Sequence, residues 1–373
     1  MNMMLWRSLG IGVWMVTASA VASAQYRFPY PVPDVPGTWP GAPSESRVIR
    51  THLDGTTSPS QRVESRTRVN GVDIVTSIIE RPDVEGRMRP SVETTTATVR
   101  TRPNAESTRH DVVAFDQSGR RMLIASTESE QKIRADGSID IVRLTSAPDP
   151  AGHLVLVSRE VEHTRSVSPE VTETERVLFL VSDHEMVETE RVNQRERQVG
   201  AGLVRREMTR SVRDVNGQFH ATETRSEEVR TSPSDSREEA TIQRPDVTGN
   251  LAVDERTVVH RSNVDGRERT TVETSTTEGA ARPGNLQLNR RLTRTTTSAA
   301  DGSSRTDEDV EARVPFAPGE PLHPVQRSSG TIRNIDERYW EMQRRLSEVD
   351  VNHQMTPIVR ETGTATASGS NGR

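Results

Sequence analysis

The sequence contains no cysteine and a single lysine, Lys132, among its 373 residues. Without cysteine the chain cannot form disulfides, thiolate metal sites or a cysteine nucleophile. Because lysine is almost absent, nearly every cation is an arginine, whose planar guanidinium suits paired contacts with carboxylates. Acidic residues (54) slightly outnumber basic ones (49), and the two signs are interleaved. No basic stripe is present, so the sequence does not predict nucleic-acid binding.

Apolar and aromatic residues are also scarce, at 31% and 3% of the chain. A thick hydrophobic core is hard to build from such a composition, and low apolar content is typical of disordered chains. Two observations argue against disorder. The net charge is only −5, and Val, Ile and Thr recur in the alternating pattern of half-buried strands. The composition therefore favours thin, solvated β-structure.

Catalytic motifs are missing from the sequence. The nine histidines are isolated, and His184-Glu185 lacks the second histidine of a zinc-protease helix. No nucleophile elbow, phosphate-binding loop or dinucleotide fingerprint occurs. We therefore predict that the protein is not an enzyme and has no cofactor and no metal site.

The N-terminal segment has the pattern of an export signal. Residues 1–24 contain Arg7, a short apolar run and the small-residue sequence Ala22-Ser23-Ala24, which is typical of signal-peptide cleavage. The apolar run is too short to span a bilayer comfortably, and no transmembrane helix is predicted elsewhere. We expect a secreted or periplasmic protein after cleavage near Ala24. Residues 25–58, rich in proline and aromatics, are predicted to be a disordered linker.

Turn signals divide the body of the chain at intervals of about 33 residues. One series has the pattern Asp-x-x-Gly and begins at Asp83, Asp116, Asp149, Asp214 and Asp246. A second series lies about 20 residues after the first and includes Asn70-Gly71, Asp136-Gly137, Asp265-Gly266 and Asp301-Gly302. Asn-Gly and Asp-Gly are strong hairpin signals, because both positions tolerate positive φ.

These turns predict an all-β fold. We expect a long antiparallel β-meander of repeated hairpins, with about 16 strands in residues 59–314 and an open or curled sheet. Around Asn70-Gly71 the register should place Val69 opposite Val72 and Val63 opposite Ile78. The Asp136 turn should pair Ile133 with Ile141. The turn at Ser118-Gly119 should pair Phe115 with Met122.

The C-terminal region changes character. After a linker at 315–330, apolar residues at spacings of three and four predict an amphipathic helix at 331–350. Residues 351–373 are predicted to be a disordered tail. The stripe of this helix, with Trp340 beside it, is a candidate surface for a partner contact or for self-association. The candidate contact residues are Ile332, Ile335, Tyr339, Trp340, Met342, Leu346 and Val349.

Function is less constrained than fold. The leading hypothesis is a non-enzymatic structural or protein-interaction scaffold, since repeat sheets present long surfaces. An alternative is a surface module that binds an envelope polymer or glycan. An outer-membrane barrel and a hydrolase are remote alternatives. The barrel would need apolar residues at every second position, and the segment 222–231 does not offer them.

Overall fold

The computed structural model describes residues 45–52, 56–102, 104–116, 118–182, 185–277, 286–313, 320–336, 339–350 and 354–366. The predicted signal peptide and most of the predicted linker after it lie outside these ranges. Within them the chain forms twenty strands and no helix.

The strands vary from 8 to 16 residues in length. In chain order they are β1 (Glu45–His52), β2 (Thr57–Val69), β3 (Val72–Pro82), β4 (Met88–Arg102), β5 (Ala105–Phe115), β6 (Arg121–Ile133), β7 (Ile139–Pro148), β8 (Leu154–Ser168), β9 (Val171–Ser182), β10 (Glu185–Gly200), β11 (Leu203–Arg213), β12 (Phe219–Thr231), β13 (Asp235–Pro245), β14 (Leu251–Val264), β15 (Arg267–Thr277), β16 (Leu286–Ser298), β17 (Ser304–Ala312), β18 (His323–Asp336), β19 (Tyr339–Val349) and β20 (Met355–Thr366).

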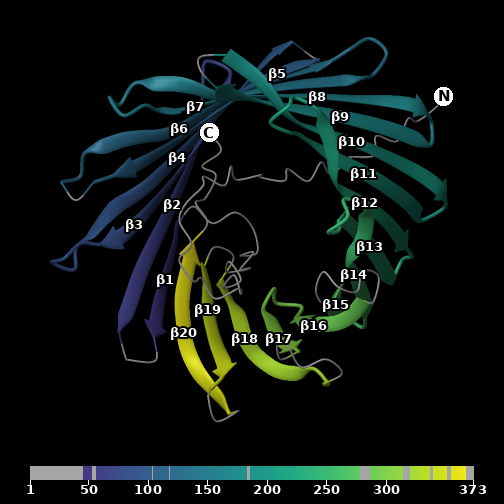
Figure 1. The fold of residues 1–373 in the computed structure, drawn as a ribbon. Coiled ribbons are helices and arrows are strands. Elements are labelled where there is room, and N and C mark those ends of the chain that lie inside the picture. Colours follow the sequence, from purple (N-terminus) through teal and green to yellow (C-terminus); the bar gives the residue numbers. More distant parts are fainter. Residues whose placement is uncertain are drawn as a thin grey trace, which may run out of the picture. The chain divides into compact units, whose positions relative to one another are not determined.

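The sheet closes on itself. Every strand pairs antiparallel with its neighbours in sequence, and β1 pairs with both β2 and β20, so the strands form a ring (Figure 1). The predicted open meander of about 16 strands is wrong. The predicted repeat region contains β2 to β17, and the segments assigned to linker, helix and tail contribute the other four strands. Closure satisfies the two backbone edges that an open sheet would leave unpaired.

The predicted C-terminal helix at 331–350 is also wrong. This segment forms the end of β18 and all of β19, which pair as an antiparallel hairpin. Met342 and Leu346 are four residues apart, so they share one side of a strand as well as one stripe of a helix. Pairing of β19 with β18 and β20 decides between the two, because the strands on either side supply backbone partners. The β20 strand lies in the predicted tail.

The Asp-x-x-Gly turns lie where the sequence places them. In all five, the glycine N–H donates to the aspartate carbonyl at 2.9–3.1 Å, and the glycine has a φ between +79° and +86°. The aspartate side chain also accepts backbone N–H groups. Asp246 Oδ1 accepts from Thr248 at 2.8 Å and from Asn250 at 3.1 Å. Because the strands alternate in direction, these turns gather at one end of the barrel, the Asp-turn end. The turns of the second series gather at the other, the Asn70 end.

Strand registers follow the sequence at one hairpin and depart from it at two. Val69 pairs with Val72 and Val63 with Ile78, as predicted. Ile133 pairs with Ile139 rather than Ile141, because the turn spans 134–138, closed by Arg134 N–H donating to the Ser138 carbonyl. Phe115 pairs with Arg121 rather than Met122, since a β-bulge shifts the register of β5 and β6. Bulges are hard to predict from sequence, because they depend on the twist and closure of the whole sheet.

The closing seam has little room for a side chain at Gly363. A Cβ added there would lie 2.9 Å from the Arg47 carbonyl oxygen and 3.2 Å from Met342 Cε. We predict that Gly363→Val lowers the free energy of unfolding by about 1–3 kcal/mol, the usual cost of overpacking. Gly330→Val is the matched control, since a Cβ at Gly330 would have its nearest neighbours at 3.6 Å or more. Thermal unfolding followed by circular dichroism would test this; equal midpoints for the two variants would contradict it.

The turn aspartates give a pH prediction. Hydrogen bonds lower the pKa of Asp246, mainly from the Thr248 hydroxyl and N–H, and that of Asp116, mainly from the Ser118 hydroxyl. A carboxyl with a lowered folded-state pKa stabilises the fold above its unfolded value of 3.8. This stabilisation is lost as the pH falls from about 3.8 through the folded pKa. We expect Asp246→Ala to lower the unfolding midpoint by a few degrees at pH 7 and to matter less near pH 3, measured by thermal melts at both pH values.

Candidate functional site: the charged inner wall

Side chains on the two faces of the barrel wall differ in exposure. Glu227 and Glu308 have side chains that are 9% and 7% exposed, whereas Asp307 and Asp309, next to Glu308 in sequence, are 43% and 50% exposed. On the concave side of a closed sheet side chains converge, and on the convex side they diverge. The less exposed set therefore faces the lumen. Cross-strand pairing propagates this assignment from strand to strand around the ring.

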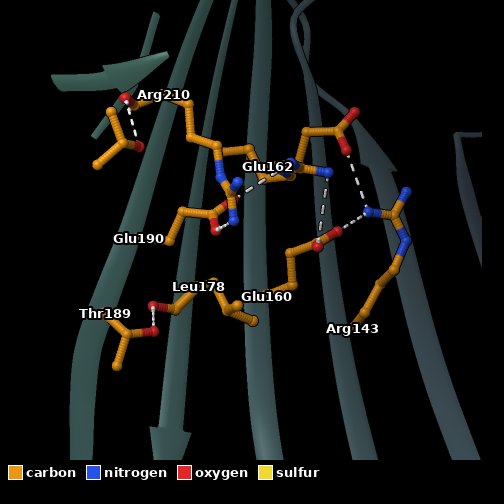
Figure 2. A network of polar contacts seen from close by, with 9 residues as sticks. Arg143, Glu160, Glu162, Leu178, Thr189, Glu190 and Arg210 are labelled. Atoms are coloured by element: carbon orange, nitrogen blue, oxygen red, sulfur yellow. Dashed lines mark hydrogen bonds and ion pairs between the residues drawn. The ribbon is translucent and has the colours of Figure 1, made fainter. Parts of the chain in front are cut away.

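A chain of ion pairs crosses the inner wall from β7 to β11 (Figure 2). Arg143 contacts both Glu160 and Glu162 of β8, with the Glu162 pair at 3.0 Å. Arg176 of β9 lies 3.9 Å from Glu160 and 3.6 Å from Glu190 of β10. The chain ends at Arg210 of β11, 2.7 Å from Glu190.

A second cluster continues the charged wall on the next strands. Arg206 of β11 donates to Glu196 at 2.6 Å and to Glu227 at 2.7 Å, and Arg225 of β12 lies 3.1 Å from Glu227. Several of these groups contact two partners of opposite sign. Shared contacts of this kind fix the guanidinium planes and keep the local charge balanced. The inner wall from β7 to β12 is thus polar and ordered.

A β-bulge in β10 separates Glu190, which belongs to this network, from Glu188, which does not. The register of β9 and β10 shifts between Glu188 and Glu190, and the Thr189 hydroxyl donates to the Leu178 carbonyl at 3.2 Å (Figure 2). Residues two apart on a regular strand share a face. The bulge inverts this, so Glu190 faces inward while Glu188 pairs with outward Arg191.

The seam of the barrel has its own inward cluster. Glu361 of β20 contacts Arg50 of β1 at 2.7 Å and Arg344 of β19 at 3.5 Å. The Glu361 side chain is 4% exposed and that of Arg344 is 12% exposed. One carboxylate therefore ties together the three strands at which the ring closes.

The outward face is also charged. Arg205 pairs with Glu228 at 2.9 Å, Arg256 with Glu239 at 2.6 Å, and each pair joins adjacent strands. These side chains are 27–57% exposed. Apolar residues such as Ile74 and Val161 also face outward, on β3 and β8. From β10 to β19, charged and hydroxyl side chains predominate on this face. The outward apolar residues therefore do not form a continuous belt around the barrel.

The residues predicted as a helix stripe are divided between the two faces. Trp340, Met342 and Leu346 face the lumen, where they are buried, and Ile332 pairs with Met342 on the same face. Tyr339 and Val349 fall on the opposite face of β19, and Ile335, near the end of β18, is 54% exposed. The structure does not bring the stripe together as one surface, and contact with a partner through a C-terminal helix is excluded because this segment is a hairpin.

Sequence reasoning missed the inner wall. The only local signal is alternation, such as Glu160 and Glu162 two residues apart on a strand. Which of the two faces is inward depends on closure, and the outward position of Glu188 depends on the bulge. Among the described residues no group of His, Asp and Glu could hold a metal ion. None of the described segments forms a helix long and apolar enough to cross a membrane.

No protein-family model matches the sequence, and no curated protein matches it. Several solved structures are similar in fold. Pseudomonas aeruginosa OpdO is 10% identical, with a TM-score of 0.46, over 87% of this chain and 95% of that one. Acinetobacter baumannii OccAB3 is 6% identical, with a TM-score of 0.42, over 86% and 97% of the two chains. The outer membrane protein opdK of P. aeruginosa is 7% identical, with a TM-score of 0.39, over 86% and 96%. All three TM-scores are below 0.5, so these likenesses do not establish a function.

We predict that Glu361→Gln destabilises the barrel by about 3 kcal/mol, because it leaves the largely buried Arg344 without a charged partner. Asp309→Asn is the matched control. Asp309 pairs with Arg327 at 2.6 Å but is 50% exposed, so its loss should cost about 1 kcal/mol or less. Urea unfolding followed by tryptophan fluorescence would measure both. Equal losses would show that Glu361 is not a closing contact.

Proposed function

We propose that the chain forms a β-barrel channel of an outer membrane. The observation that supports this most directly is the closed ring of twenty antiparallel strands, in which every connection joins neighbours. A barrel satisfies all backbone hydrogen bonds within the sheet, which is the condition for strands to cross a bilayer. An even strand number with hairpin connections and strands of 8–16 residues agrees with the architecture of outer-membrane barrels.

The lumen supports a channel rather than a packed core. Small barrels of about eight strands are filled by their own side chains, whereas wider ones enclose a channel or a plugged lumen. The inner wall has paired Arg and Glu side chains from β7 to β12, and a polar interior is typical of barrels that conduct water-soluble molecules. Diffusion through such a lumen requires no catalytic group.

The charged side chains of the outward face make insertion into a bilayer energetically costly. An arginine on the lipid face costs about 2–4 kcal/mol at the midplane and less near the interfaces. The outward charges of β11 to β14 are paired across strands, as in Arg205–Glu228 and Arg256–Glu239. Pairing lowers the cost of removing such groups from water without abolishing it.

Two expectations from the sequence are corrected here. The structural or protein-interaction scaffold is wrong, because the sheet closes into a ring and the C-terminal helix on which that hypothesis relied is a β-hairpin. The secreted or periplasmic location is wrong for the same reason, since a closed hairpin barrel of this size belongs to the architecture found in outer membranes.

The proposal predicts ion conduction. Full-length protein refolded in detergent should migrate differently with and without heating on a gel and should produce discrete conductance steps in a planar bilayer. Protein that stays in the aqueous phase during vesicle flotation, with no conductance steps, would overturn the proposal.

Because the sequence contains no cysteine, a single introduced cysteine can report which face of the barrel a residue occupies. On β10, Gln194 faces the lumen and Asn193 faces outward. We predict that a charged, membrane-impermeant thiol reagent modifies Gln194→Cys in a bilayer and changes the conductance. Asn193→Cys, the matched control, should react at least tenfold more slowly, because lipid covers it. If Asn193→Cys reacted as fast as Gln194→Cys, the outward face would be in contact with water, contrary to the proposal.

A further inference from the structure

An apolar collar lies on the outward face beside the Asp turns. Each hairpin at this end joins an odd strand to the next even strand, and its first outward pair of residues lies next to the turn. Six even strands begin with a large apolar residue that belongs to this pair: Met88, Leu154, Phe219, Leu251, Leu286 and Met355. In the β5–β6 hairpin the apolar residue is Phe115, and in the β9–β10 hairpin Val181 pairs with Met186. These residues form the first row of the collar.

A second apolar row lies directly behind the first. It consists of the next outward pairs of the same hairpins, and its members include Pro90, Leu156, Phe179, Val253, Leu288 and Pro357. Leu154, Leu156 and Leu251 are 43%, 37% and 38% exposed. The collar is therefore accessible from outside the barrel.

A ring of β-bulges ends the collar. In every even strand from β4 to β20, the register shifts a few residues after the strand begins. The first outward position beyond the bulge is charged on six of these strands, at Glu93, Arg159, Arg191, Arg256, Arg291 and Arg360. Each lies five positions after the first-row residue of its own strand.

This spacing sets the height of the collar. At about 3.3 Å per residue, along strands tilted by about 40°, the two apolar rows extend about 10 Å from the turns. A typical spanning barrel has an outward apolar band about 25 Å tall. The collar therefore matches the hydrocarbon of one leaflet rather than of the whole bilayer.

In the described part of the chain, the Asn70 end does not repeat this double row around the ring. Val264 is 63% exposed at that end, but the next outward pair behind it is Ser262–Arg269. The first outward pair of the β6–β7 hairpin is Lys132–Asp140. The apolar surface of two rows therefore belongs to the Asp-turn end.

Three of the Asp-x-x-Gly turns also have a valine at the tip. Val84, Val215 and Val247 follow the turn aspartates and are 105%, 101% and 80% exposed. The turn requires its aspartate and its glycine, and valine is not among the residues that favour turns. A fully exposed side chain adds no packing to the barrel. These tips extend the apolar surface of the Asp-turn end beyond the collar.

We infer that the acyl chains of one lipid leaflet cover the collar, so that the barrel contacts the membrane through its Asp-turn end. The inference rests on the proposed function, because it takes the barrel to be a membrane protein. The collar runs from β3 to β16 and resumes at β19 and β20; it is broken by Thr51 and Thr57 at β1–β2 and by Glu311 at β17–β18. A protein partner or a second copy would cover one sector of such a ring, whereas lipid surrounds it on all sides.

Fluorescence quenching by lipid would test which end contacts acyl chains. Leu251→Cys and Val264→Cys place a label on the same strand and the same face, at opposite ends of β14. Each full-length variant is labelled with an environment-sensitive fluorophore and refolded into phosphatidylcholine vesicles that carry a nitroxide on the acyl chain. We expect quenching at least threefold stronger at position 251 than at position 264. Equal quenching at the two positions would overturn the collar.

Vesicle flotation of two triple variants would test whether the collar contributes to binding. L154N/M186N/L251N removes three exposed apolar side chains from the collar, and V69N/V199N/V264N removes three from the Asn70 end, where they are 52%, 43% and 63% exposed. We expect the collar variant to need at least tenfold more lipid for half-maximal binding, because less apolar surface leaves water. The control should change less than threefold. Circular dichroism of each variant would confirm that it is folded, and equal losses would overturn the collar.

The outcomes separate this inference from the proposed function. Conductance steps together with equal quenching at positions 251 and 264 would overturn the collar and leave the channel standing. Strong quenching at position 251 alone, without conductance, would overturn the channel and leave the collar standing. Absence of quenching at both positions, without conductance, would overturn both.

Discussion

The pairing of β1 with β20 is the contact on which the rest of this structure depends. A sheet with so few apolar residues has little hydrophobic burial to stabilise it, and in the described ranges only nine apolar residues are buried. Closing the ring pairs the two edge strands and removes the sites at which such a sheet would fray or aggregate. Two features lie at this seam. Glu361 forms ion pairs with Arg50 and Arg344 and so links three strands. Gly363 has no side chain, which allows the Arg47 backbone and the Met342 side chain to approach closely.

Closure also gives the charged residues their roles. An open sheet with Arg and Glu on both faces would have two equivalent solvated surfaces. Once the sheet is closed, the same alternation produces an inner wall with shared, partly buried ion pairs and an outer wall with separate, exposed ones. The loss of one partner from an inner pair is costly, because it leaves the other charge less exposed to water and uncompensated. The outer pairs contribute little to stability. They instead determine how costly it is to place the outward face in lipid.

The turns and one hairpin register could be predicted from the sequence. The Asp-x-x-Gly turns are fixed by two local requirements, a glycine with positive φ and an aspartate that accepts nearby N–H groups, and neither needs distant residues. The Asn70-Gly71 hairpin is equally local, and its register follows directly. At the C-terminus the local pattern was ambiguous, because Met342 and Leu346 fit both a helical stripe and one side of a strand. Only pairing with the adjacent strands β18 and β20 distinguishes the two.

The sequence by itself determined an all-β chain without disulfides, the positions of the Asp-x-x-Gly turns and the antiparallel order, because turn chemistry acts over four or five residues. The tertiary structure decided that the sheet closes, that β1 and β18 to β20 belong to it, and which charged side chains face the lumen. These features depend on contacts between residues some 300 positions apart, such as Arg50 with Glu361, and on bulges such as that at Thr189. No local pattern encodes them, because a shift of one residue anywhere in the ring moves side chains to the opposite face.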